Sequence, residues 1–428
     1  MSSSGMAGNP ARFATSAALW QLTLWFVAMM FVGTFQYGWS LFIGPIDAAH
    51  HWGRAAINVA FTIFVFTEAF STVPIGVLLQ RHGEKKMVFV SGLLLGIAGC
   101  IFFFATSLVG LYLGAFVGGI GVGIISCAAP YGAVKWFPQK RGLATGIVVT
   151  GFVGGSLLTV LTINGVIGEV GYAKTFLMVG LAQAVALMAI AAFIRSPTWR
   201  EAPVQERDAE PRFESVREVL GTSEIRAALR SPAFWLLFAI FTLVGAGGLM
   251  ATAQFVPMAT DFKVAQLPVN FLWFTMAAVP LALTFDRWMN ALCRPIFGWI
   301  SDLAGREFTM CLAFGLEALS IYLFINHAHD PLSFVVFSGL IFFGWGELFS
   351  VMPTTIADTF GTKYATTIYG ILYSAKGVGA IFVPLANSAM SAFGWSWYSV
   401  FYAAVVFDII AVVLAFILYE YRKSIGNL

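Results

Sequence analysis

Charged side chains are scarce in this sequence. They make up 11% of its 428 residues, whereas a soluble domain carries about 25%. Hydrophobic residues make up 59%, which is more apolar surface than one or two soluble cores could bury. This composition excludes a soluble enzyme, a secreted disulfide-rich domain and a disordered chain, and the net charge of +3 calls for no nucleic-acid partner. We therefore expect an all-α polytopic membrane protein whose main partner is the lipid bilayer.

Residues that build metal and catalytic centres are also few. The four cysteines lie inside apolar stretches without a CxxC pair, and the five histidines fall in loops or at the ends of apolar stretches. No zinc motif, Ser/His dyad or pair of aspartates can be assembled from them at depth. A glycine-rich run at 114–123 has no strand before it, so it indicates close helix packing rather than a nucleotide loop. We expect neither an enzyme nor a protein that holds a metal or an organic cofactor.

Twelve apolar runs are long enough to cross a ~30 Å hydrocarbon core as helices, which takes about 20 residues. The first six lie at 18–46, 56–79, 87–107, 109–133, 142–165 and 173–194. The second six lie at 233–257, 270–301, 309–327, 332–356, 365–390 and 396–420. A long polar stretch, residues 195–231, separates the two sets. We predict twelve transmembrane helices in two six-helix bundles, residues 1–194 and 232–428, joined by a cytoplasmic linker with room for a short amphipathic helix.

The distribution of Lys and Arg predicts the orientation of the chain. With the N-terminus inside the cell, cytoplasmic segments hold 18 of the 24 basic residues and external segments hold three. The remaining three, Arg287, Arg294 and Lys376, fall within apolar runs. We expect a monomeric, multi-pass protein of the inner (plasma) membrane with both termini in the cytoplasm.

The two halves share local sequence at one offset. Residues 76–85 (GVLLQRHGEK), at the end of the second span, match residues 298–307 (GWISDLAGRE), at the end of the eighth, at an offset of 222. Residues 137–147 (FPQKRGLATGI) resemble residues 360–371 (FGTKYATTIYGI) at offsets of 223 to 224. Because two separate loops agree on one period, we predict that the halves are duplicated, pseudo-symmetric bundles.

These residues carry a family resemblance. The twelve-span plan, with a G-x-x-x-D-x-x-G-R loop after span eight, resembles the major facilitator superfamily; in the copy after span two, Gln80 stands where the acidic residue is expected. Three segments, 136–144 (WFPQKRGLA), 293–302 (CRPIFGWISD) and 373–377 (YSAKG), resemble the oxalate/formate antiporter family, which is related to the monocarboxylate porters. The resemblance covers nearly the whole chain and implies the major facilitator fold and the transport of small carboxylate anions.

Two basic residues are predicted to lie near the middle of the membrane. Lys376 comes 13 residues after Lys363, at the cytoplasmic start of span eleven, which places it about 19 Å deep. Arg294 comes eight residues before Asp302, at the cytoplasmic end of span eight, about 12 Å deep. A charge at such depth costs about 2.5–3.5 kcal/mol on insertion scales, and neither cation has an acidic neighbour three or four residues away. We interpret them as the binding site of an anion between the halves.

A structural ion pair with another helix is the alternative for each cation. The carboxylates available for it are Glu68, Glu317, Glu347 and Asp408. The family resemblance favours substrate binding, because the antiporter family holds its carboxylate substrate with one cation on span eight and another on span eleven. A planar guanidinium and a point charge would together suit a small dicarboxylate that bridges the cavity.

Helical spacing places polar side chains beside both cations. Tyr373 lies three residues before Lys376, and Asn290 lies four before Arg294, so each shares a helix face with its cation. Both are candidates for the substrate site.

Further candidates lie on other spans. Gln36 and Tyr37 belong to a polar cluster in the otherwise apolar first span, and Trp345 lies in span ten. The family resemblance implies that Tyr37, Trp345 and Tyr373 line the substrate pocket. Arg287, seven residues before Arg294, could guide anions inward or pair locally with Asp286.

Together these residues predict a secondary active transporter that exchanges small carboxylate anions, oxalate for formate or a similar pair, by alternating access. Closing an empty cavity over two unpaired cations costs several kcal/mol, so such a carrier would move only when it is loaded. The alternative is a proton-coupled symporter of a monocarboxylate such as lactate, pyruvate or formate. It needs a protonatable carboxylate near the site, for which Asp286, Glu68 and Glu347 are candidates.

Overall fold

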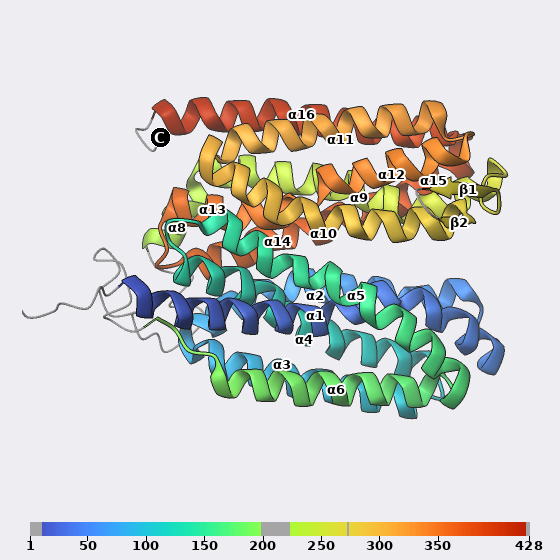
Figure 1. Cartoon of the computed structure of the whole chain (residues 1–428), viewed down its shortest axis with the longest axis horizontal. Helices are drawn as coiled ribbons and strands as arrows, with labels where there is room; N and C mark the ends of the chain where they lie inside the picture. Colours follow the sequence, from blue (N-terminus) through green and yellow to red (C-terminus); the bar gives the residue numbers. More distant parts are fainter. Residues whose placement is uncertain (1–10, 198–222, 272–273, 425–428) are drawn as a thin grey trace, which may run out of the picture.

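The computed structural model describes residues 11–197, 223–271 and 274–424. Most of these residues belong to long helices that run along the long axis of the molecule (Figure 1). Nine helical segments of the described residues, with α12 and α13 counted as one, are long and apolar enough to cross a membrane. Helices suit that environment because they satisfy their own backbone hydrogen bonds where no water is available. The all-α fold class expected from the sequence is confirmed.

The N-terminal bundle contains six helices. They are α1 (Ala11–His50), α2 (Arg54–His82), α3 (Glu84–Phe104), α4 (Leu108–Trp136), α5 (Arg141–Val170) and α6 (Tyr172–Phe193).

The described part of the second half begins with α8 (Ser223–Arg230), whose Ile225 and Ala228 are buried while Glu224 and Arg226 are exposed. It is the short amphipathic helix expected in the linker; residues 198–222 of the predicted linker lie outside the described residues. The elements that follow are α9 (Pro232–Asp261), β1 (Pro268–Phe271), β2 (Phe274–Ala277), α10 (Ala278–Ala304), α11 (Arg306–His327), α12 (Pro331–Trp345), α13 (Leu348–Phe360), α14 (Ala365–Ala380), α15 (Phe382–Phe393) and α16 (Trp397–Ser424).

Local signals set several helix boundaries. Asp330 accepts a hydrogen bond from the backbone N–H of Ser333 at 2.8 Å and caps α12, with Pro331 as the first helical residue. The same hydrogen bond lowers the pKa of the Asp330 carboxyl. Gly83 and Gly305, which the repeat aligns, adopt positive φ angles of 78° and 94° between consecutive helices. A left-handed turn of this kind favours glycine.

Three of the predicted spans differ from the helices that form. Span eight was expected to begin at residue 270, but β1 and β2 form an antiparallel hairpin there and α10 starts only at Ala278. The hairpin's apolar and β-branched residues extend the apolar run, so hydropathy alone merges it with the helix. Span ten is interrupted between α12 and α13, and span eleven between α14 and α15.

The two bundles contact each other through two helix pairs that are equivalent under the internal repeat. In Figure 1, α1–α6 form one layer and α9–α16 the other. Across the boundary α5 packs against α10, and α2 packs against α14. The offset of 222–224 relates α2 to α10 and α5 to α14, so the two contacts are equivalent by pseudo-two-fold symmetry. The predicted internal repeat is therefore visible in the packing.

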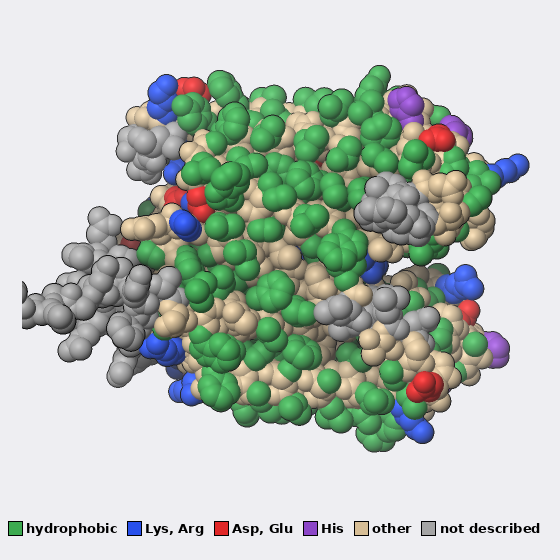
Figure 2. All heavy atoms as spheres, viewed as in Figure 1, with side chains coloured by type: hydrophobic (Ala, Val, Ile, Leu, Met, Phe, Trp, Pro, Cys, Tyr) green, Lys and Arg blue, Asp and Glu red, His purple; other side chains and the backbone are tan. Residues whose placement is uncertain are grey.

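On the face drawn in Figure 2, the surface is apolar along the middle of the helices, and the charged side chains lie toward their ends. The beginning of α1, the end of α16 and helix α8 all lie at the same end of the molecule, on the left in Figure 1. We call this the linker end.

Candidate functional site

A small cavity lies between the two bundles. Its volume is about 20 Å³, room for about one water molecule. The walls come from α1, α4 and α5 of the first half and from α10, α12, α13 and α14 of the second. The lining residues are Met29, Gln36, Tyr37, Ser126, Pro130, Val149, Phe152, Arg294, Trp345, Phe349, Tyr369, Tyr373 and Lys376.

Six of the eight candidate residues predicted from the sequence line this cavity. They are Arg294, Lys376, Gln36, Tyr37, Trp345 and Tyr373. Asn290 lies behind the wall and accepts a hydrogen bond from Arg294. Arg287 lies outside the lining, with its guanidinium carbon 5.4 Å from the centroid of the Tyr37 ring. That these residues bind substrate stays a prediction.

Lys376 forms an ion pair with Glu68 of α2. Its Nζ lies 3.0 Å from each carboxylate oxygen of Glu68, and both side chains are buried. The hydroxyls of Tyr373 and Ser126 donate to Glu68 Oε1 at 2.9 and 3.3 Å. A longer contact of 3.5 Å joins Lys376 Nζ to Gln36 Oε1. For Lys376 the structure contains the alternative that the sequence left open, an ion pair with a carboxylate on another helix, and that carboxylate comes from α2 of the other half.

Arg294 has a different environment. Its Nη1 donates to the carbonyl of Val149 at 2.6 Å and its Nε donates to Asn290 Oδ1 at 3.2 Å. The guanidinium carbon lies 5.1 Å from the centroid of the Phe349 ring. The side chain is 3% exposed, yet among the described residues it forms no ion pair with a carboxylate. Because a buried charge without a counter-ion is costly, this guanidinium is suited to bind an anion that enters the cavity.

Aromatic rings form much of the remaining wall. Phe349 lies 5.4 Å from Trp345 and 6.3 Å from Tyr373 between ring centroids. The ring of Phe152, on the opposite side, lies 5.8 Å from that of Tyr37. Such rings exclude water and lower the local dielectric, which strengthens the interaction of an anion with the cations.

Sequence reasoning missed the positions of Glu68 and Phe349 at this site. Glu68 was considered only as a possible ion-pair partner or proton carrier. The repeat contains the signal that could have placed it, because an offset of 222 aligns Glu68 with Asn290 and Thr72 with Arg294. Phe349 lies just beyond the interruption between α12 and α13, and no pattern in the sequence distinguished it from the other aromatic residues.

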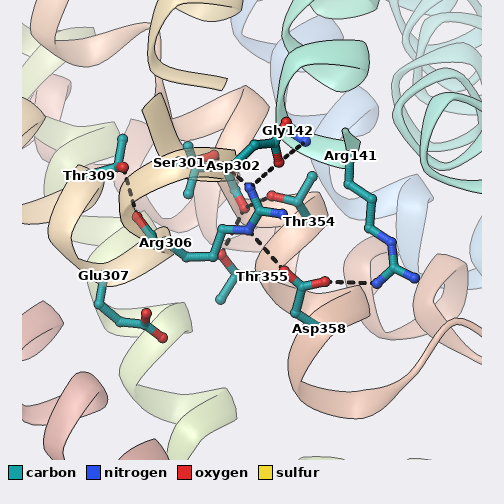
Figure 3. Close-up of polar contacts among 12 residues, drawn as sticks. Arg141, Gly142, Ser301, Asp302, Arg306, Glu307, Thr309, Thr354, Thr355 and Asp358 are labelled. Carbon is teal, nitrogen blue, oxygen red and sulfur yellow. Dashed lines mark hydrogen bonds and ion pairs between the residues drawn. The ribbon is translucent and has the colours of Figure 1, made fainter. Parts of the chain in front are cut away.

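A network of charged side chains joins the two halves at the linker end (Figure 3). Asp302 of α10 accepts hydrogen bonds from the backbone N–H groups of residues 142–143, at the start of α5, at 2.9 Å each. Arg306 donates to Asp302 at 2.7 Å and to Asp358 at 2.8 Å. Arg141 pairs with the other oxygen of Asp358 at 2.7 Å. A carboxylate at a helix N-terminus is favourable because of the exposed N–H groups and the helix dipole.

At the linker end, the symmetry-related contact between α2 and α14 is made through neutral hydrogen bonds. Gln80, which the repeat aligns with Asp302, donates to the carbonyl of Lys363 at 2.8 Å and accepts from the Thr367 hydroxyl at 2.8 Å. The hydroxyl of Tyr131 also donates to the carbonyl of Thr362. Both interfaces are thus hydrogen-bonded at the linker end, whereas the outline of the molecule is notched between the halves at the opposite end (Figure 2).

Comparison with known proteins agrees with this architecture. A sequence model of the Major Facilitator Superfamily matches residues 24–290 and 275–427. The oxalate:formate antiporter of Oxalobacter formigenes is 30% identical over 378 residues, covering 88% of this chain and 85% of the relative. A probable nitrate/nitrite transporter of Mycobacterium tuberculosis is 25% identical over 373 residues, covering 82% and 85%. Among solved structures, the proton:xylose symporter XylE has the same fold, with a TM-score of 0.68 at 14% identity and coverage of 95% of this chain and 96% of that one.

Proposed function

The chain belongs to the major facilitator superfamily, and on this premise we propose that it is a secondary active transporter that exchanges small carboxylate anions, oxalate for formate or a similar pair, by alternating access. We further propose that it acts as a monomer in the inner membrane with both termini in the cytoplasm, so that the linker end faces the cytoplasm. In this proposal the two halves, residues 1–194 and 232–428, rotate relative to each other and expose the cavity alternately to the two sides of the membrane.

The observation that carries this proposal is the buried guanidinium of Arg294, which forms no ion pair with any carboxylate of the described residues. It lies where the halves meet, on the wall of a cavity whose other cation is Lys376. A planar guanidinium can hold a carboxylate through two parallel hydrogen bonds. The identity of 30% with an oxalate:formate antiporter supports carboxylates as the substrate class.

The hydrogen bonds at the linker end support alternating access. If the halves rock, these contacts must open when the cavity faces the linker end and re-form when it faces the other way. The small cavity volume is in keeping with an occluded conformation in such a cycle. Substrate binding would then require the ring of Phe349 and the cationic side chains to move apart.

Counterflow in proteoliposomes tests the proposal. Purified protein is reconstituted with unlabelled formate or oxalate inside, and the uptake of labelled substrate is followed for the wild type, Arg294→Gln and Lys376→Gln. We expect both variants to lose exchange. Arg54→Gln is the matched control, because Arg54 is exposed at the start of α2. Exchange at wild-type rates in Arg294→Gln would overturn the proposal.

A second candidate is proton-coupled symport of a monocarboxylate such as lactate, pyruvate or formate. The contact between Glu68 and Lys376 favours it, because a group that can accept a proton touches a cation of the cavity. Symport predicts that an imposed pH gradient drives uptake into empty vesicles. Exchange predicts that uptake requires an internal counter-anion. Competition by oxalate, malonate, formate, acetate and lactate would then rank the substrates.

A further inference from the structure

Glu68 gives the cavity a carboxylate of its own. We propose that Glu68 is a fixed internal anion that determines which substrates the site accepts: a single carboxylate binds as it is, and a dicarboxylate enters only together with a proton that neutralises Glu68. This inference rests on the proposed transport of carboxylates and adds to it the charge of the substrate and a specificity-determining residue.

Glu68 occupies the position that a substrate carboxylate would need. Both of its oxygens lie 3.0 Å from Lys376 Nζ, and the Tyr373 hydroxyl donates to one of them. The carboxylate of Glu68 is fully buried and Lys376 is 3% exposed, so water does not screen the pair. A substrate carboxylate can reach Lys376 only by displacing Glu68 or sharing the cation with it.

The sum of the formal charges in the cavity then determines which substrate charge the site accepts. Lys376 and Glu68 cancel, and Arg294 leaves one positive charge without a carboxylate partner among the described residues. One monocarboxylate makes the loaded cavity neutral. A dicarboxylate would leave it with one excess negative charge, which is costly in a buried site of low dielectric. A proton on Glu68 removes that excess and frees Lys376, so that the two carboxylates of the substrate can bind Lys376 and Arg294.

The other ionisable groups near Glu68 are less suited to carry this proton. They are Lys376, Tyr369 and Tyr373 of α14 and Tyr37 of α1, together with Arg294 of α10 on the cavity wall and Cys127 of α4 near Tyr369. Tyrosine and cysteine are ordinarily uncharged at neutral pH, and Lys and Arg are ordinarily protonated already. The charged side chains at the start of α3, residues 84–86, follow the end of α2, which is about 21 Å along that helix from Glu68. Glu68 is therefore the group whose charge can change with the substrate.

The charge count has an electrical consequence. Oxalate with one proton and formate alone each carry one net negative charge. Their exchange is therefore electroneutral, and one proton enters with each oxalate and is released from Glu68 when oxalate leaves the cavity. Replacing Glu68 by a neutral residue leaves two positive charges in the empty cavity, which favours a dianion without a proton.

Oxalate uptake into formate-loaded proteoliposomes tests the inference. A potassium gradient with valinomycin sets the membrane potential, and an entrapped dye reports internal pH. For the wild type we expect uptake that does not respond to the potential, acidifies the interior by one proton per oxalate and accelerates as the external pH falls. For Glu68→Gln we expect uptake that responds to the potential and not to pH, with the rate of formate exchange relative to oxalate exchange lowered about tenfold.

Glu317→Gln is the matched control. Glu317 is a fully buried glutamate of α11 that lies outside the cavity lining, so this variant should keep the wild-type substrate ratio and pH response. Oxalate-for-formate exchange by the wild type that responds to the potential and moves no proton would overturn the inference while leaving the proposed function intact. Because this measurement uses the wild type, it tests the inference even if Glu68→Gln does not fold. An absence of carboxylate exchange by the wild type would overturn the proposed function itself.

Discussion

Gly146 of α5 lies directly against the backbone of Arg294 on α10, so that a Cβ at position 146 would overlap the Arg294 carbonyl oxygen. The repeat reproduces this contact in the other half-interface, where a Cβ on Gly370 would overlap the carbonyl oxygen of Thr72. The residue proposed to bind the substrate is therefore on a stretch of helix where the backbones of the two halves are in close contact. Arg294 therefore connects two events: its side chain is proposed to bind the substrate, and its backbone packs against α5 when the two halves are closed at the linker end.

We predict that Gly146→Ala prevents full closure at the linker end. The added methyl group has backbone atoms on its far side that cannot turn away, so α5 and α10 must separate. Exchange should fall by about 5- to 150-fold, the factor that corresponds to an overpacking cost of about 1–3 kcal/mol. Accessibility of a cysteine introduced at Thr150 to a reagent added from the linker end should increase. Gly154→Ala on the same helix is the control, because nothing lies within 4 Å of its Cβ position and wild-type exchange is expected.

Lys376→Gln should destabilise the protein as well as inactivate it. It leaves the Glu68 carboxylate buried without its cation, which costs about 3–5 kcal/mol. Thermal unfolding in detergent measures the loss. The double variant Glu68→Gln/Lys376→Gln removes both charges and should recover most of the stability without recovering exchange. If the double variant is no more stable than Lys376→Gln, the ion pair does not contribute as described.

At the linker end, the contact between α5 and α10, which contains Asp302, should be stronger than the contact between α2 and α14, which contains Gln80. Asp302→Asn replaces charge-assisted hydrogen bonds, worth about 1.5–3 kcal/mol each, by neutral ones. Gln80→Leu removes only neutral hydrogen bonds, worth about 0.5–1.5 kcal/mol each. We therefore expect Asp302→Asn to slow exchange more and to increase labelling from the linker end more. Equal effects would indicate that the two contacts are energetically equivalent despite their different chemistry.

Two buried carboxylates of the second bundle, Glu317 and Asp408, should tolerate loss of their charge. The oxygens of Glu317 and of Asp408 have no hydrogen-bond partner in the described part of the chain. Glu317→Gln is therefore expected to change the free energy of unfolding by no more than about 1 kcal/mol, in contrast to the larger loss in Lys376→Gln. Thermal unfolding of the two variants side by side checks this. A loss in Glu317→Gln as large as in Lys376→Gln would show that the carboxylate has a charged partner.

The sequence predicts the membrane fold and the depth of both cations because these follow from distances along single helices. Arg294 and Lys376 could be placed from their spacing to the loops. The partner of Lys376 could not be predicted in this way, because the pairing of α2 with α14 depends on how the two halves dock. Only the repeat alignment indicates that pairing. The hairpin at 268–277 and the interruption beside Trp345 were missed since hydropathy records an apolar run and not its backbone conformation.

The central claim is that the guanidinium of Arg294 holds the carboxylate of the transported anion. Its most direct test is counterflow of labelled formate and labelled oxalate by Arg294→Gln and Arg294→Lys, with each variant first shown to unfold at a temperature close to that of the wild type. We expect no measurable exchange for Arg294→Gln. For Arg294→Lys we expect an apparent affinity weaker by about tenfold or more, because a lysine cannot form the planar fork. Exchange of either anion by Arg294→Gln with wild-type rate and affinity would contradict the central claim.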